Sequence, residues 1–160
     1  MPRYHMHKKE REITAPEILE EILRRGKFAV LALCRGNEPY ALTLSYGYDP
    51  AARVLYFHTA HQGRKWHFLE ANPSVCATVI EDGGYIMGEC AHNFRSVVLY
   101  GKISRVDSLE EKKIGMEVML RHLEDDPETV RRRSLPDDRA YDRAAILKLS
   151  IEEMTGKAGR

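Results

Sequence analysis

The sequence predicts a mainly β protein, an antiparallel β-barrel with peripheral helices. Six or so short segments have the apolar or alternating pattern of strands, and turn residues such as Gly36-Asn37 and Asp49-Pro50 join neighbouring ones. These connections are too short for the crossovers that parallel strands need. Three segments with helical periodicity lie outside the strands. Together these observations favour a barrel over a parallel α/β sheet.

Size and composition predict one soluble domain. The chain has 160 residues, of which 43% are hydrophobic and 31% charged, and we assign residues 1–160 to a single domain. A net charge of +1 gives no basic field for nucleic acid or an anionic membrane. We see no membrane-spanning apolar run and no signal-peptide core. The odd cysteine count favours reduced thiols, so we expect a cytoplasmic protein.

The first third of the chain predicts an arm, a helix and two strands. Residues 1–13 are polar and basic, which is typical of an N-terminal arm. A capping box at Thr14 starts a helix over Glu17–Arg25, and Gly26 ends it. Its apolar stripe consists of Ile18, Leu19, Ile22 and Leu23. The nearly continuous apolar run Phe28–Leu33 predicts a strand that is buried on both faces.

The second strand, Tyr40–Tyr48, alternates between two kinds of side chain. Leu42, Leu44 and Tyr46 form an apolar face. The opposite face is small and hydroxylated, and consists of Ala41, Thr43, Ser45 and Gly47. Such a face suits the close approach of a flat ligand, and it is equally compatible with plain exposure to solvent.

The remaining segments predict further strands and helices. The strands are Val54–Thr59, Ser74–Glu81, a shorter one near Tyr85–Cys90 after a Gly83-Gly84 turn, Phe94–Val106 with a bulge or close-packing point at Gly101, and Ala145–Ser150. A capping box at Ser108 begins a helix through about Leu123, with a buried face of Ile114, Val118, Met119, Leu120 and Leu123. The charged segment 128–143 predicts a surface helix or loop, and residues 151–160 a C-terminal tail.

The stretch 54–69 contains the clearest candidate site. An apolar strand ends at His58 and Thr59, a turn with Gly63 follows, and Arg64 and Lys65 open a helix. Free backbone N–H groups and the helix dipole favour an anion at such a point, and two cations add charge-assisted hydrogen bonds to a phosphate. A basic first helical turn on the surface is the alternative interpretation.

Other chemistry is less well supported by the sequence. His58 ends a strand beside the predicted anion site, where an imidazole could donate a proton or hydrogen bond, although a histidine satisfied by its neighbours fits equally well. A metal site of Cys76, Cys90 and His92 has competent ligands but the spacing of no common module. Neither a nucleophile elbow nor a nucleotide-binding glycine loop is present.

Four motifs in order resemble the pyridoxamine 5'-phosphate oxidase-like family, in particular the branch related to nitroimidazole-resistance proteins (nitroimidazole reductases). The motifs are residues 39–46 (PYALTLSY), 55–60 (LYFHTA) with 63–65 (GRK), 94–102 (FRSVVLYGK) and 151–157 (IEEMTGK). The resemblance implies a split β-barrel that binds FMN, or FAD, at a homodimer interface. It also implies a flavoprotein oxidoreductase that takes electrons from NAD(P)H.

The resemblance also assigns roles to individual residues. It places residues 41–46 along the flavin ring and ribityl chain, with Phe57 and His58 continuing that wall and His58 as the candidate catalytic residue. It assigns the phosphate to Arg64 and Lys65, and a contact from the partner subunit to Arg95 and Ser96. The full predicted flavin-binding set is Ala41, Leu42, Thr43, Leu44, Ser45, Tyr46, Phe57, His58, Thr59, Gly63, Arg64, Lys65, Arg95 and Ser96. No metal ligand is included.

Three functions therefore follow as hypotheses. The first is an FMN-dependent, nitroreductase-like oxidoreductase that reduces a small electrophile such as a nitroaromatic. The second is a flavin-storing or flavin-sensing module without turnover, and the third is a haem-binding relative of the same barrel. Because the C-terminal substrate-binding Arg and His residues of true pyridoxamine phosphate oxidases have no match, oxidation of pyridoxamine phosphate is not expected.

Overall fold

The computed structural model describes residues 6–159, so the first five residues of the predicted arm and Arg160 of the predicted tail lie outside the described residues. The strands are β1 (Glu12–Ile13), β2 (Phe28–Arg35), β3 (Glu38–Asp49), β4 (Val54–Thr59), β5 (Ser74–Ile86), β6 (Ala91–Val106) and β7 (Ala145–Ala158). The helices are the 3₁₀ turn η1 (Lys9–Arg11), α1 (Pro16–Arg25), α2 (Arg64–Ala71), α3 (Leu109–Leu123), α4 (Pro127–Ser134) and α5 (Asp138–Asp142).

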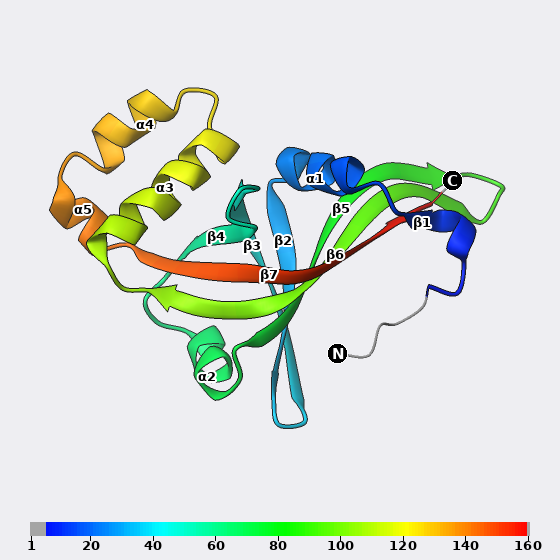
Figure 1. The fold of residues 1–160 in the computed structure, drawn as a ribbon, viewed down its shortest axis with the longest axis horizontal. Helices are drawn as coiled ribbons and strands as arrows, with labels where there is room; N and C mark the ends of the chain where they lie inside the picture. Colours follow the sequence, from blue (N-terminus) through cyan, green and yellow to red (C-terminus); the bar gives the residue numbers. More distant parts are fainter. Residues whose placement is uncertain (1–5, 160) are drawn as a thin grey trace.

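Six of the strands form a closed antiparallel ring, which confirms the predicted barrel. Their order is β7-β4-β3-β2-β5-β6, and a β6–β7 ladder closes the ring. That ladder runs from Arg95 opposite Ala158 to Val106 opposite Ile146. β1 adds to the outer edge of β7 through Glu12 and Ile13. Figure 1 shows β6 and β7 crossing the front of the barrel, with β2 and β3 running steeply behind them.

Two helices cover the two ends of the barrel and complete one apolar core. α1 contributes Leu19, Ile22 and Leu23, each less than a tenth exposed, and α2 contributes Phe68. These side chains pack with inward-facing strand residues such as Leu31 and Leu99. In Figure 1, α1 lies at the top of the barrel and α2 at the bottom. The interior is therefore filled, and a ligand must bind at the surface or at an end.

β4 is the strand that is buried on both faces. Leu55 and Phe57 point into the barrel core, whereas Val54 and Tyr56 belong to a second cluster beneath α3. This double burial explains why Val54–Phe57 is a continuous apolar run. The same burial was predicted for Phe28–Leu33, and that prediction was wrong. β2 alternates between buried and more exposed positions, and Phe28 is 57% exposed.

β5 and β7 extend well beyond their predicted ends. β5 continues through Gly83-Gly84 to Ile86, because an irregularity in the β5–β6 ladder absorbs both glycines and the Asp82 carboxylate accepts a hydrogen bond from Gly84 N. There is thus no separate strand at 85–90, and the turn follows Ile86. β7 continues past Ser150 to Ala158, so residues 151–158 pair with β6 and do not form a tail.

The helices follow the prediction with two corrections. Ala15, and not Thr14, is the N-cap of α1, and no side chain caps it. In α3, Ser108 accepts a hydrogen bond from Glu111 N as predicted, but Ile114 is 49% exposed. The buried face of α3 is centred on Gly115, because this glycine lets the helix approach the Tyr56 ring.

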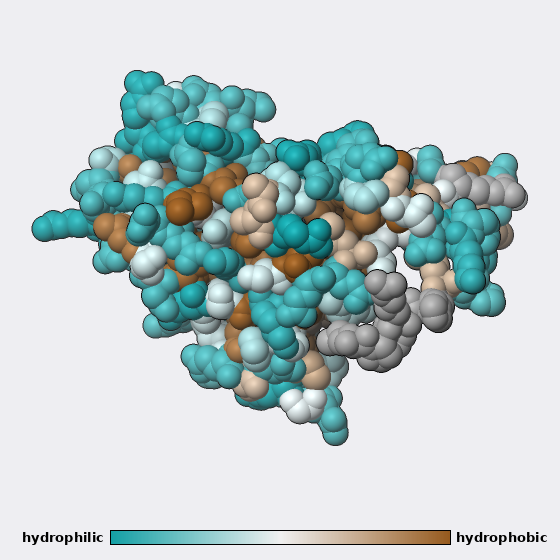
Figure 2. Space-filling view, viewed as in Figure 1, coloured by the Kyte–Doolittle hydropathy of each residue, from teal (hydrophilic) through white to brown (hydrophobic). Residues whose placement is uncertain are grey.

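The charged segment 128–143 forms surface helices, one of the two predicted alternatives. Arg131 binds Glu117 of α3 at 2.7 Å and also pairs with Glu128, so much of this charge is neutralised within the chain. Figure 2 shows hydrophilic surface over these helices and more hydrophobic surface along the middle of the molecule. Among residues 6–159, no helix has the length and apolar character needed to cross a bilayer.

Gly101 marks the point where the closing ladder changes register. Tyr100 lies opposite Glu153, but Gly101 lies opposite Ile151, so β7 carries one extra residue there. A Cβ atom on Gly101 would lie 2.0 Å from the Ser150 carbonyl oxygen. The irregularity predicted at Gly101 is confirmed. β6 and β7 approach so closely there that a side chain at position 101 has no space.

We expect Gly101→Ala to lower the free energy of unfolding by roughly 1–3 kcal/mol, the usual cost of forcing a backbone shift in a packed interior. Urea unfolding followed by circular dichroism measures this loss. Gly36→Asn is the control, because Gly36 has open space around it and a φ of 57° that asparagine tolerates. Equal stability of Gly101→Ala and wild type would show that the ladder relaxes there without cost.

Candidate functional site

The loop before α2 adopts the geometry that the sequence predicted for an anion site. Gly63 is the N-cap of α2 and has a φ of 128°, a conformation that residues with a side chain rarely adopt. No side chain caps the helix, and its first turn contains no acidic residue. The first N–H groups of a helix have no partner within it. Trp66 N already donates to the Gly63 carbonyl oxygen at 3.2 Å. The N-terminus of α2 therefore offers its remaining backbone donors and a positive dipole end to an anion.

Lys65 is the unusual side chain of this loop. It is only 9% exposed, and its stem lies along the apolar end of the barrel among residues such as Leu42 and Leu44. Its Nζ donates to the Gln62 carbonyl oxygen at 3.2 Å. The other buried lysine, Lys112, has the Asp142 carboxylate at 4.0 Å. Within residues 6–159, no carboxylate lies that close to Lys65, so its charge is left without a counter-ion.

Arg64 projects outward beside Lys65 and is already engaged within the chain. Its Nη2 donates to Glu38 Oε1 at 2.5 Å, and its guanidinium lies 5.3 Å from the centroid of the Tyr40 ring. The side chain is 61% exposed, so an anion at the helix start could share it with Glu38. The two cations thus differ: Arg64 is paired and accessible, whereas Lys65 is buried and unpaired.

Three side chains that sequence reasoning missed hold residues 60–63 in place. Trp66 Nε1 donates to the Ala60 carbonyl at 3.0 Å. Arg105 on β6 donates to His61 Nδ1 at 3.2 Å, which leaves His61 Nε2 to donate to the Arg143 carbonyl at 2.6 Å. The contact between residues 61 and 105 is distant in the sequence, and no local pattern signals it. It ties the loop to the barrel wall.

Three of the four residues predicted for the small face of β3 are exposed, whereas the fourth, Gly47, is buried against Met119 of α3. Ala41, Thr43 and Ser45 point away from the core, next to the outward-facing residues of β2. The other predicted flavin contacts of this region have side chains in or against the core. These are Leu42, Leu44, Tyr46 and Phe57. The Tyr46 hydroxyl donates to the Leu23 carbonyl at 2.6 Å, and burial raises its pKa.

His58 lies on the outer face of β4, close to this small face. The β3–β4 ladder ends at the Tyr46–Phe57 pair. Ser45 and His58 are the next residues of the two strands beyond that pair, so they are neighbours. Partial burial, and secondarily the charge of His61, lowers the pKa of His58. At neutral pH its ring is therefore uncharged and can donate one hydrogen bond. Thr59 follows it at the end of β4, directly before the loop.

Arg95 and Ser96 lie at the other end of the barrel from Arg64. Ser96 pairs with Ile80 on β5, level with Phe28 and Ser45, whereas Arg64 contacts Glu38 at the opposite end of β3. Seven residues of strand separate these levels, which corresponds to on the order of 20 Å. Arg95 bonds Glu21 at 2.9 Å and Glu81 at 2.6 Å.

The structure brings part of the predicted site together. Gly63, Arg64 and Lys65 lie at the Glu38 end of β3, next to core-facing side chains of that strand such as Tyr40 and Leu42. Ala41, Thr43 and Ser45 lie on the opposite, outward face of β3, His58 lies toward its Ser45 end, and Arg95 and Ser96 lie on β6. Among residues 6–159, no group of three His, Cys, Asp or Glu side chains is placed to hold a metal ion. Cys76 is partly buried and Cys90 is exposed, and they do not form such a group with His92.

The model of the family described as pyridoxamine 5'-phosphate oxidase matches residues 15–158, from the start of α1 to the end of β7. No curated protein sequence matches the chain.

Several solved structures have the same fold. A candidate 5-nitroimidazole antibiotic resistance protein from Bacteroides thetaiotaomicron is 22% identical, with a TM-score of 0.76 over 98% of this chain and 96% of that one. A FAD-binding protein from Mesorhizobium loti is 21% identical, with a TM-score of 0.68 over 94% and 96%. A flavocytochrome from Azotobacter vinelandii is 20% identical, with a TM-score of 0.80 over 97% and 72%. At these identities the likeness establishes the fold.

We expect the His58 imidazole to titrate below its ordinary pKa of 6.5, because burial disfavours its charged form. The unfolded chain then binds a proton more readily than the folded one. The stability linked to His58 is therefore present above pH 6.5 and is lost as the pH falls from there to the folded pKa. Imidazole carbon–proton NMR spectra, assigned with His58→Gln, measure the midpoint. A midpoint at or above 6.5 would contradict the prediction.

Proposed function

We propose that this chain binds a flavin and transfers electrons through it to a small electrophile. The chain belongs to the pyridoxamine 5'-phosphate oxidase family, because that family's model matches residues 15–158. FMN is the flavin that we expect, with FAD as the alternative, and NAD(P)H is the expected electron donor. A nitroaromatic is the proposed class of electrophile. It is suggested by the similarity to the candidate 5-nitroimidazole resistance protein.

The observation that carries the proposal is the unpaired ammonium of Lys65 at an uncapped helix start. A buried cation without a counter-ion is costly, and an anion that binds there recovers part of that cost. The helix N–H groups and the nearby Arg64 guanidinium add donors in the same place. A phosphate dianion matches this set, because it can accept several charge-assisted hydrogen bonds at once. The 5'-phosphate of a flavin would supply it.

The outward face of β3 offers a surface for the flat ring system of a flavin. Ala41, Thr43 and Ser45 have short side chains, so a planar ligand can lie close to the β3 backbone, where two hydroxyls offer hydrogen bonds. His58 borders this surface with a neutral ring, which can orient an acceptor atom by donating a hydrogen bond. A bound flavin would supply the redox chemistry, and these residues would position it and limit its access to solvent.

A homodimer is part of the proposal. Phe28, the first residue of β2, and Ile80 of the adjacent strand β5 point outward and are 57% and 55% exposed. Exposed apolar side chains in a row suit a protein interface. A second copy packed on this face would bring its own Arg95 and Ser96 toward the first copy's β3 surface, which a single chain cannot do.

Two other functions in the same fold compete with this proposal. A flavin-storing module needs the same phosphate site but no turnover, and a haem protein has precedent in the similar flavocytochrome. The absorption spectrum of the purified protein distinguishes flavin from haem. Steady-state oxidation of NADH and NADPH by the flavin-loaded protein, with and without a nitroaromatic acceptor, distinguishes turnover from storage.

We expect Lys65→Met to raise the Kd for FMN roughly 10- to 100-fold, the range for losing a hydrogen bond to a charged group. Methionine keeps the apolar length of the buried lysine stem, so the fold should be retained. Titration of the flavin-free protein, followed by quenching of flavin fluorescence, measures the Kd. Lys113→Met is the matched control, since Lys113 lies on α3 and pairs with Asp138. Unchanged FMN affinity of Lys65→Met would remove the phosphate assignment.

We expect the protein to sediment as a dimer and Ile80→Asp to shift it toward the monomer, because a carboxylate would be buried in the proposed interface. Ile114→Asp is the control, because this isoleucine is similarly exposed but lies on α3. Analytical ultracentrifugation distinguishes the two states. A monomeric wild type, or equal dimerisation of both variants, would show that the sheet face is not the interface.

A further inference from the structure

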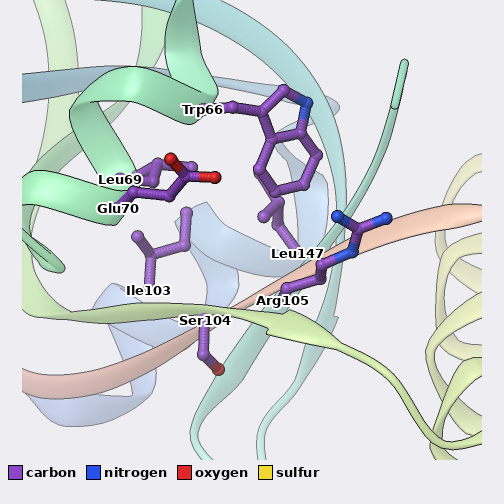
Figure 3. Close-up of a pocket in the computed structure, with 7 residues that line it drawn as sticks. All are labelled: Trp66, Leu69, Glu70, Ile103, Ser104, Arg105 and Leu147. Carbon is purple, nitrogen blue, oxygen red and sulfur yellow. The ribbon is translucent and has the colours of Figure 1, made fainter. Parts of the chain in front are cut away.

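A small pocket lies between α2 and the end of β6, apart from the small face of β3. Its volume is about 130 Å³, and Leu69, Ile103 and Leu147 form its apolar floor. Trp66 forms one wall, and Glu70 and Arg105 stand at its mouth (Figure 3). Engineered apolar cavities of a similar size, on the order of 150 Å³, take up benzene. The pocket can therefore hold one small ring or a short aliphatic chain.

The two charged side chains at the mouth differ in their existing partners. Arg105 stacks on Trp66 with its guanidinium carbon 5.0 Å from the ring, donates to His61 and faces the Asp107 carboxylate at 3.7 Å. Glu70 is exposed and has no hydrogen bond or ion pair with any residue of the described range 6–159. In Figure 3 its carboxylate lies over the apolar floor and points toward Trp66. The charge that is available to a ligand at the pocket mouth is thus the negative charge of Glu70.

The indole of Trp66 does not compete with Glu70 for a ligand cation. Arg105 lies over the ring, and Lys65 Nζ is 5.7 Å from its centroid, so cations of the protein already occupy this aromatic surface. A third cation placed on the ring would be repelled by both. The tryptophan therefore contributes an apolar wall, and the carboxylate is the group that recognises charge.

From this arrangement we propose that the pocket is a binding site for a small primary amine with an aromatic or short aliphatic body. The body fills the space above Leu69, Ile103 and Leu147, and the ammonium group pairs with Glu70. This site does not depend on the proposed flavin function, because it shares no residue with the β3 face. It adjoins the loop before α2, since Trp66 lines the pocket and also binds the Ala60 carbonyl.

The test uses Trp66 as its reporter, because it is the only tryptophan of the chain. The full-length protein, with any flavin that co-purifies, is titrated with 2-phenylethylamine. The single indole N–H signal in a nitrogen–proton NMR spectrum follows binding, and tryptophan emission gives a second readout. We expect a saturable shift in the millimolar range, the affinity typical of a ligand of about nine non-hydrogen atoms.

Matched ligands and variants test the role of the charge. We expect 2-phenylethanol and 3-phenylpropionate, which keep the ring but not the ammonium, to bind at least roughly 10-fold more weakly, the cost of losing a charged hydrogen bond. Glu70→Gln should weaken the amine to the same extent, and Glu110→Gln on α3 should not. Equal binding of amine and alcohol, tighter binding of the carboxylate, an unaffected Glu70→Gln variant or an indole signal that does not move would each overturn the proposal.

Discussion

The β6–β7 ladder is the interaction on which the arrangement of the whole molecule depends. It joins the two edges of what would otherwise be an open sheet, and so turns six strands into a ring without free edges between them. Closure fixes which side chains face inward, and α1 and α2 then cover the two ends of the apolar interior. The loop before α2 consequently lies at a barrel end, where Arg64 contacts Glu38 and Tyr40 of β3 and Lys65 borders the apolar interior.

The candidate site combines a buried positive charge with a loop that is held in place by several contacts. Lys65 is only 9% exposed, and no carboxylate within residues 6–159 forms an ion pair with it. Its loop is nevertheless held at three points, by Trp66, Arg105 and the Lys65 ammonium itself. A loop that is already ordered loses little conformational freedom when an anion binds, so more of the interaction energy appears as affinity. Through Trp66, the same contacts connect the proposed phosphate site with the proposed amine pocket.

Much of the fold and part of the site could be predicted because the signals are local. The alternation of β3, the Gly36-Asn37 turn and the Gly63-Arg64-Lys65 start of α2 each depend on a few adjacent residues. The extension of β7 was missed because Glu152, Glu153 and Gly156 interrupt an apolar pattern, although the strand is held by its ladder to β6. The exposed Ile114 was misjudged because packing against Tyr56 selects Gly115, and the helix itself shows no sign of that preference.

The position of β7 in the chain has a consequence for how the protein forms in the cell. β7 pairs with β1, β4 and β6, yet among the strands of residues 6–159 it is the last to leave the ribosome. Until then β4 and β6 keep an unpaired edge, and α3 has only part of the surface that it covers. The barrel can therefore close only after the other strands have been synthesised. During synthesis the half-formed sheet therefore exposes unpaired strand edges, which favour aggregation until β7 is in place.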